Sequence, residues 1–217
     1  MKKSVLLAGA VLALSLFGAA GTQAATITGL FNTGVDGTGT PLAEGATDTH
    51  YLVNGTGSPV VYDHPSYLLP SDARFIAVSA TGDYTLNPNT FSLTFDLTGF
   101  NAATAQLTGN FEADNYASVF LNGNLIAQDL QTTTVTNFQS FTPFSASSAD
   151  FVAGLNTLSF VVTDTGPPSA FLVSGLSGTA DLAGGVPEPA SWALMLLGFG
   201  GLGVAIRSQR KPSAVAA

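Results

Sequence analysis

The chain has 217 residues, of which 46% are hydrophobic and 9% are charged, and its formal net charge at pH 7 is −8. It has no cysteine, which excludes disulfides, zinc–thiolate sites and cysteine nucleophiles. Between residues 25 and 188 all fourteen acidic residues occur, but only one basic residue, Arg74. Such a surface repels nucleic acids and anionic lipids, and it favours neutral or cationic partners and divalent cations.

The N-terminal residues have the organisation of a secretory signal peptide. Lys2 and Lys3 form a basic region, an apolar stretch follows over residues 5–20, and Thr22 and Ala24 are the small residues at positions −3 and −1. We therefore predict export and cleavage between Ala24 and Ala25, so that residues 1–24 form the signal peptide.

The body from residue 25 to residue 176 shows the two-residue period of β-strands. Apolar and polar side chains alternate over residues 91–98, 105–111 and 158–163. This alternation is typical of antiparallel sheets with one face on a core, and Asn122-Gly123 between apolar runs predicts a hairpin. We expect an all-β fold, a single antiparallel β-sandwich, followed by a small-residue linker over residues 177–186.

Residues 187–211 combine a Pro-Glu-Pro motif, the uncharged stretch 190–206 and a basic stop formed by Arg207, Arg210 and Lys211. As a helix the stretch would extend about 25 Å, the lower limit for crossing a bilayer core of about 30 Å. The cations then place the tail, residues 212–217, in the cytoplasm. We therefore predict a C-terminal transmembrane helix. An ordinary single-span anchor is the alternative, but it would not need Pro187, Glu188 and Pro189.

This segment resembles the PEP-CTERM sorting signal of Gram-negative bacteria, which exosortases process. The resemblance rests on Pro187, Glu188 and Pro189, on Trp192-Ala193, on the glycine-rich residues 196–203 and on the basic cluster. It implies that the tail holds the protein in the inner membrane until an exosortase, a membrane-embedded cysteine transpeptidase, cuts near the Pro-Glu-Pro motif. The protein would then pass to the cell surface or outside the cell.

The body resembles a second group, the galactose-binding-like jelly rolls. The resemblance is carried by six segments that occur in the same order in many secreted bacterial modules: residues 33–36, 48–51, 95–99, 113–115, 120–123 and 154–164. It implies a jelly-roll sandwich. Many members of the group bind carbohydrate and others have no known ligand, so the resemblance transfers no ligand residue.

Asp114, Asn115 and Asp164 are the candidate calcium ligands. Calcium takes six to eight oxygen ligands, mostly carboxylates, amides and carbonyls. In sandwiches of the type that the body resembles, a structural calcium often lies near such loops. Asp and Asn are also standard turn residues, so turn formation is the alternative interpretation.

Tyr62, His64 and Tyr67 are the candidate glycan contacts, because they share one loop, 62–67, that could present aromatic faces to a sugar. The alternative is that these rings cap the edge of the sandwich.

No catalytic set emerges from the sequence. The two histidines, His50 and His64, do not stand in a serine-hydrolase motif, and no pair of carboxylates has the context of a glycosidase. We therefore expect a non-catalytic, exosortase-processed surface or extracellular-matrix protein that interacts with exopolysaccharide or another glycan. A purely structural coat protein without a discrete ligand is the alternative, and a glycan-active enzyme ranks third.

Overall fold

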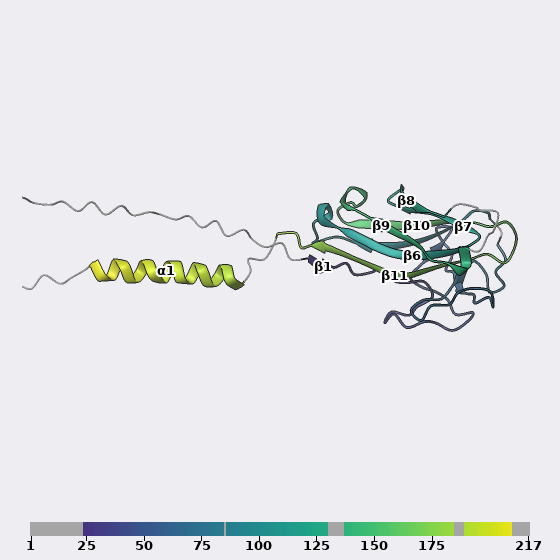
Figure 1. The fold of residues 1–217 in the computed structure, drawn as a ribbon, viewed down its shortest axis with the longest axis horizontal. Helices are drawn as coiled ribbons and strands as arrows, with labels where there is room; N and C mark the ends of the chain where they lie inside the picture. The colour runs from purple at the N-terminus through teal and green to yellow at the C-terminus, as the bar shows by residue number, and fades with distance from the viewer. Residues whose placement is uncertain (1–23, 85, 130–136, 185–188, 210–217) are drawn as a thin grey trace, which may run out of the picture. The chain divides into compact units, whose positions relative to one another are not determined.

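The computed structural model describes residues 24–84, 86–129, 137–184 and 189–209 (Figure 1). The chain divides into two units, of which one is the body, Gln23–Gly184, and the other joins Met1–Thr22 with Gly185–Ala217. Several predicted features lie outside the described residues: residues 1–23 of the signal peptide, Pro187, Glu188, Arg210, Lys211 and the tail 212–217.

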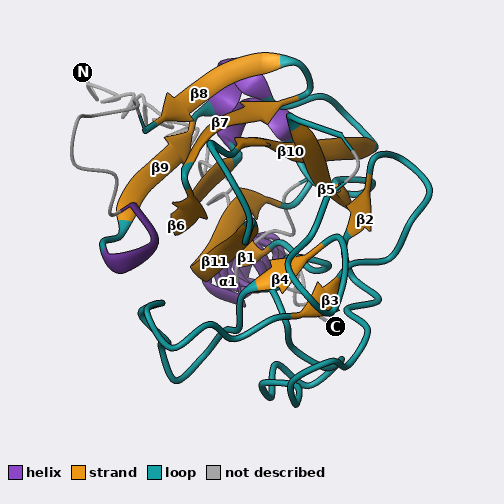
Figure 2. Ribbon diagram, turned by 90° about the vertical axis from the view of Figure 1, so that its right-hand side faces the viewer, coloured by secondary structure: helices purple, strands orange, loops and turns teal. Residues whose placement is uncertain are grey.

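The described part of the body is a sandwich of a six-stranded and a five-stranded antiparallel sheet (Figures 1 and 2). The first sheet contains β1 (Ala24–Thr26), β3 (Val60–Val61), β4 (Ile76–Ala77), β6 (Gln106–Asp114), β9 (Thr142–Ala146) and β11 (Ala170–Asp181). The second contains β2 (Leu52–Val53), β5 (Asn89–Asp96), β7 (Tyr116–Leu121), β8 (Asn124–Gln128) and β10 (Leu155–Thr163). Short 3-10 helices are η1 (Ala102–Thr104), η2 (Asn137–Gln139) and η3 (Ser148–Asp150).

The strand orders are β3-β4-β11-β6-β9, with β1 also paired to β11, and β2-β5-β10-β7-β8. The open edges of the two sheets therefore include β9 and β8, which are neighbours in the fold. The prediction of an all-β, single-sandwich body is confirmed.

The core lies between the sheets and is rich in phenylalanine. Phe91 on β5, Phe160 on β10 and Phe171 on β11 are each at most 1% exposed. The Phe160 and Phe171 ring centroids are 4.5 Å apart, and those of Phe91 and Phe171 are 5.5 Å apart. Burying such a side chain stabilises the fold by about 1.5–3 kcal/mol, which explains why the alternating runs predicted these strands correctly.

The predicted hairpin joins β7 to β8. Asn122 and Gly123 both have positive φ, 52° and 85°, as a tight two-residue β-turn requires. The Asn122 side chain also donates hydrogen bonds to the carbonyl oxygen of Asp150, at 2.9 Å, and to Oδ1 of Asn156, at 2.7 Å. The turn is therefore bonded to the end of η3 and to the start of β10.

The linker was predicted over residues 177–186, and the first five of these residues are not a linker. Residues 177–181 belong to β11, where Ala180 pairs with Ala25 on β1 and Gly178 pairs with Leu107 on β6. A Cβ atom at Gly178 would lie 2.9 Å from the carbonyl oxygen of Gln106. The small residues therefore allow strands to approach closely, and sequence composition alone suggested flexibility instead.

A second apolar layer covers the outer face of the six-stranded sheet. Successive side chains of a strand point to opposite faces, so Ala170 and Leu172 face away from the main core that holds Phe171 and Val173. They pack with residues from the segment 67–77, namely Tyr67, Ala73, Phe75 and Ala77. This layer positions the loops at one end of the sandwich.

The C-terminal unit contains the helix α1 (Pro189–Gln209), which covers the stretch where a helix was predicted. Among the residues that the structure describes, no helix is both long and apolar enough to cross a membrane.

Candidate functional site

The residues predicted to bind glycan and those predicted to bind calcium meet at one end of the sandwich. The Tyr67 hydroxyl donates to Oδ2 of Asp114 at 2.7 Å, and the Asn115 side chain donates to Oδ1 of the same carboxylate at 2.7 Å. Burial raises the pKa of Asp114 to about 6, and the nearby charge of Asp164 adds to the rise. Together these residues form what we call the end-loop cluster: Tyr62, His64, Tyr67, Asp114, Asn115 and Asp164.

The aromatic rings of the end-loop cluster pack against one another. Tyr67 is 7% exposed, and its ring centroid lies 4.3 Å from that of Phe75 and 5.5 Å from that of Phe138. Tyr67 therefore does not offer the face to a sugar that we expected, because its ring belongs to the outer apolar layer. Tyr62 and His64 are half-buried, with ring centroids 6.4 Å apart.

Most oxygens of the predicted calcium ligands already accept hydrogen bonds. Oδ1 of Asn115 accepts from the backbone N–H and the hydroxyl of Thr165, both at 2.6 Å, and both Asp114 oxygens are engaged as described above. Within the described ranges, no three or more His, Cys, Asp or Glu side chains are grouped so that they could hold a metal ion. The side chain of Asn115 therefore stabilises these loops through hydrogen bonds to Thr165 and Asp114, and calcium binding stays a prediction.

Asp164 differs from its two neighbours. Its side chain is 5% exposed, and neither carboxylate oxygen has a hydrogen-bond partner among the described residues. Burial raises its pKa, and the nearby donors of Gly166, Thr165 and Tyr84 offset part of that rise. Asp164 is therefore the member of the predicted calcium set whose oxygens are unengaged.

Glu112 is a second buried carboxylate, and no sequence pattern singles it out. It is fully buried on β6, opposite Leu172 of β11, and neither of its oxygens has a partner in the described part of the chain. Burial raises its pKa to about 7. Its neighbours Phe111 and Ala113 face the main core, so the alternation of β6 turns Glu112 toward the outer layer.

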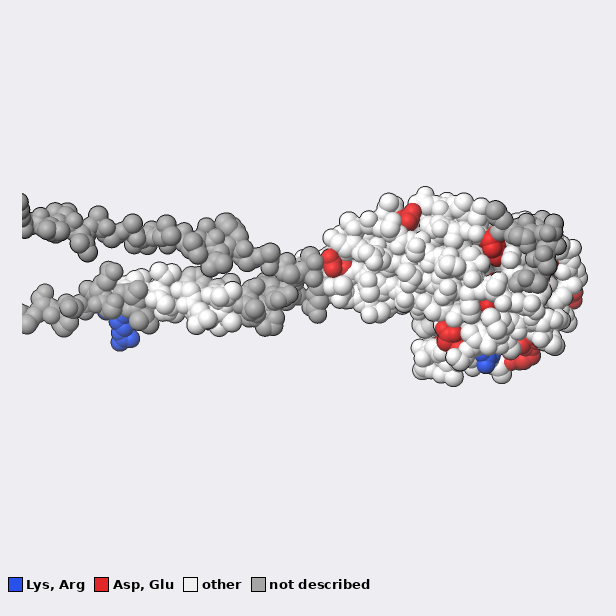
Figure 3. Space-filling model, viewed as in Figure 1, with Lys and Arg blue, Asp and Glu red and all other residues white. Residues whose placement is uncertain are grey.

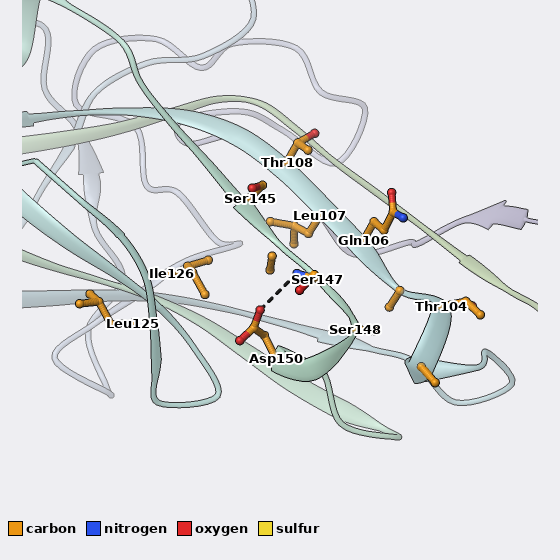
Figure 4. Close-up of a pocket in the computed structure, with 13 residues that line it drawn as sticks. Thr104, Gln106, Leu107, Thr108, Leu125, Ile126, Ser145, Ser147, Ser148 and Asp150 are labelled. Carbon is orange, nitrogen blue, oxygen red and sulfur yellow. Dashed lines mark hydrogen bonds between the residues drawn. The ribbon is translucent and has the colours of Figure 1, made fainter.

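A groove runs along the edge strand β9, near the opposite end of β6 from the end-loop cluster (Figure 4). Its first part holds about 550 Å³ and is lined by η1, β6, β8, β9 and η3. A second hollow of about 450 Å³ shares Thr108, Ile126 and Ser145 with the first, so the two are continuous.

The groove is lined mainly by hydroxyl and apolar side chains. Leu125 and Ile126 supply apolar surface, and Asp150 is the carboxylate among the lining residues. Gln106 and Asn110 add amides. The hydroxyl groups belong to Thr104, Thr108, Ser145, Ser147 and Ser148. No lining residue is basic.

Sequence reasoning missed the groove. Gln106 and Thr108, and likewise Ser145, occupy the polar positions of alternating strands, which ordinarily indicate a solvent-facing surface. Whether such a surface is flat or hollow depends on how β9, β8 and η3 come together, and these segments are distant in sequence.

The C-terminal segment matches a known sorting signal. Residues 185–211 match the family model described as the PEP-CTERM protein-sorting motif. The match confirms the resemblance found in the sequence. A comparison with curated proteins found no match.

Several solved structures are similar to the body at low sequence identity. A family 35 carbohydrate binding module from an environmental isolate is 16% identical, with a TM-score of 0.35 over 71% of this chain and 98% of that one. The Stig cyclase Fisc from Fischerella sp. TAU is 12% identical, with a TM-score of 0.42 over 71% and 99%. A CBM35 from Paenibacillus barcinonensis is 13% identical, with a TM-score of 0.34 over 60% and 99%. At these values the likeness carries no argument about a ligand.

Proposed function

We propose that this protein is exported, processed by an exosortase at its C-terminal segment, and retained at the cell surface or in the extracellular matrix, where its sandwich binds exopolysaccharide. The sorting motif at residues 185–211 supports the destination. The groove along β9 is the observation that carries the binding function, because its shape and chemistry fit a segment of a hydroxyl-rich polymer.

The groove's side chains match the chemistry of a sugar chain. Each Ser or Thr hydroxyl can donate one hydrogen bond and accept two, so a row of them can pair with sugar hydroxyls in several orientations. The apolar part formed by Leu125, which is exposed, and the half-buried Ile126 can contact the carbon faces of the rings. Water-mediated contacts add to such an open site without weakening it.

The position of the groove suits a polymer rather than a small molecule. It is open, and it follows β9, whose five residues extend about 16 Å at roughly 3.3 Å per residue. A long chain can therefore lie in it and continue beyond both ends. An enclosed pocket would be expected for a small ligand.

The same residues support binding rather than catalysis. Glycoside hydrolysis ordinarily uses two carboxylates that flank the scissile bond, whereas Asp150 is the single carboxylate of the groove lining. The lining also contains no histidine. An acid–base pair is therefore missing from the groove, and we propose a non-catalytic role.

The test is a binding measurement of the full-length chain with a panel of bacterial exopolysaccharides. Ser145 lies in both parts of the groove and is exposed on an edge strand, so Ser145→Tyr should fill the groove without entering the core. We expect this variant to lose affinity by about tenfold or more, which corresponds to about 1.4 kcal/mol.

Thr94→Tyr is the matched control, because Thr94 is exposed on β5, in the other sheet. It should bind like the parent chain. Equal loss in both variants, or no binding of any polymer, would overturn the proposal and favour a purely structural coat protein.

A further inference from the structure

We propose that the groove selects glycans that carry protonated amino groups over uncharged or acidic ones, with Asp150 as the selecting residue. This inference rests on the proposed glycan-binding function and adds a ligand class to it. It is carried by the placement of one carboxylate in a groove whose lining contains no cation.

The carboxylate of Asp150 is held in place by the end of η3. Its Oδ2 accepts a hydrogen bond from the backbone N–H of Ser147 at 3.2 Å, as Figure 4 shows. The main-chain oxygen of Asp150 accepts from the side chain of Asn122 in the β7–β8 turn at 2.9 Å. One carboxylate oxygen is therefore engaged by the protein, and the other can receive a donor from a ligand.

Among the described residues of the body, no positive charge lies in the groove lining to neutralise Asp150. The lining residues include no Lys, Arg or His. In the described part of the body the basic residue is Arg74, whose guanidinium donates to the carbonyl oxygens of Pro70 and Ala73 and lies 3.7 Å from Asp63. On the face of the body shown in Figure 3, the acidic side chains stand apart from one another, and a basic side chain lies between two of them near the lower edge.

An ammonium group fits these acceptors. It offers three donors and no acceptor, and the groove provides a carboxylate oxygen together with the hydroxyls of Ser147 and Ser148, which can accept. A charge-assisted hydrogen bond is stronger than a neutral one. A uronate would instead place its negative charge against Asp150, and like charges at short range disfavour binding.

A divalent cation is a poorer occupant of the same place. Calcium takes six to eight oxygen ligands, and Asp150 is the lone carboxylate among the lining residues. The ligand class is therefore an amine-bearing sugar chain, such as a deacetylated amino-sugar polymer.

The experiment compares glucosamine oligomers with N-acetylglucosamine oligomers of the same length, and with galacturonate oligomers, on the full-length chain at mildly acidic pH. The first two ligands differ only in the N-acetyl group, which converts the positively charged amine of glucosamine into a neutral amide. We expect the glucosamine oligomer to bind about three- to tenfold more tightly than the acetylated one, and the galacturonate oligomer to bind most weakly.

Asp150→Asn keeps an oxygen for the Ser147 N–H but removes the charge. It should abolish the preference for the amine while retaining affinity for the acetylated oligomer, and Asp150→Glu should preserve the preference. The matched control is Asp83→Asn. It also removes one carboxylate charge, from an exposed side chain whose Oδ2 accepts a hydrogen bond from the hydroxyl of Thr81, two residues away. This variant should keep the preference, because Asp83 does not line the groove.

The outcomes separate the two proposals. Equal affinity for the amine and acetyl oligomers, or preferred binding of galacturonate, would overturn the amine selection and leave glycan binding standing. An equal effect of the Asp83 and Asp150 changes would show diffuse attraction by the acidic body and would also overturn it. Failure of all three oligomers to bind, while another polymer of the exopolysaccharide panel binds, would overturn the amine selection alone, and failure of the whole panel would overturn both proposals.

Discussion

The hydroxyl of Tyr67 donates a 2.7 Å hydrogen bond to Oδ2 of Asp114, and this bond joins the outer apolar layer to the end of β6. Both residues are less than 10% exposed. The bond also lowers the pKa of Asp114, although burial has the larger, opposite effect. The pair therefore stabilises the end of the sandwich and leaves no free ring face for a ligand.

Tyr67→Phe should lower the free energy of unfolding by about 1–3 kcal/mol, because it leaves a buried carboxylate oxygen without its donor. Chemical denaturation at neutral pH measures the change. Tyr62→Phe, at a half-buried ring of the same cluster, should have a clearly smaller effect. Equal effects would mean that the hydrogen bond to Asp114 is not the stabilising contact.

Glu112 should make the protein less stable as pH rises. Its pKa is raised by burial to about 7 in the folded chain, against 4.5 as the ordinary value, so the folded state holds the proton more tightly than the unfolded state. The free energy of unfolding then falls between about pH 4.5 and pH 7 and levels off above. Asp114 and Asp129, whose pKa values burial raises to about 6, act in the same direction.

Glu112→Gln should remove this part of the pH dependence and stabilise the protein above pH 7 by up to about 3 kcal/mol, since one pKa unit corresponds to about 1.4 kcal/mol. Denaturant midpoints across the pH range provide the measurement. Asp36→Asn is a useful control, because hydrogen bonds from Thr38 and Thr40 lower the pKa of Asp36. A Gln variant that is no more stable than the parent at high pH would contradict the assignment.

The folded body should resist trypsin. Between residues 25 and 188 the cleavage point is Arg74, which is half-buried, and its backbone N–H donates to the carbonyl oxygen of Thr33 at 3.0 Å. Trypsin should therefore trim the terminal segments at Lys3 and Arg207 and leave the body intact, because cleavage at Arg74 requires local opening. Mass spectrometry would show one fragment in buffer and two after digestion in denaturant. Rapid cleavage after Arg74 in buffer would show that this loop is not docked as described.

Calcium binding is expected to act through Asp164, whose carboxylate oxygens are unengaged within the described residues. A cation that binds only the folded state stabilises it by about 2.7 kcal/mol at a hundred times its Kd. Melting temperature should therefore rise with calcium more than with magnesium at equal ionic strength, and Asp164→Asn should remove the difference. Equal responses to the two cations would indicate screening of the acidic body rather than a site.

Processing should leave a C-terminus near residue 188. The sorting motif at residues 185–211 motivates this expectation, and mass spectrometry of surface-extracted protein would locate the new end. Glu188→Ala, which alters the motif without shortening the apolar segment, should accumulate in the unprocessed form. Mature extracellular protein that still carries Arg207 and the residues after it would contradict the prediction.

The sequence predicted the elements that depend on local pattern. The alternation in β5, β6 and β10 and the Asn122-Gly123 turn follow from rules that act within a few residues, and the structure confirms them. It did not reveal that Gly178 permits close strand packing, because the contact is with Gln106, far away in the chain.

The site was less accessible to prediction for the same reason. Tyr67 reads as an exposed loop ring, yet it is buried by Phe75 and Phe138, and its partner Asp114 is 47 residues away. The groove similarly requires β9 and β8 to meet beside η3. Local sequence records which side chains are polar, whereas the tertiary arrangement decides which of them surround a hollow.

The pairing of β1 with the end of β11 has a topological consequence. Ala25, the expected first residue of the mature chain, lies opposite Ala180, close to the point where the sorting segment begins. The two ends of the body therefore lie close together. A short peptide could join them, and the chain could instead begin and end in an exposed turn such as that at Gly37, which would give a circularly permuted domain. The domain would then keep its sheets unchanged.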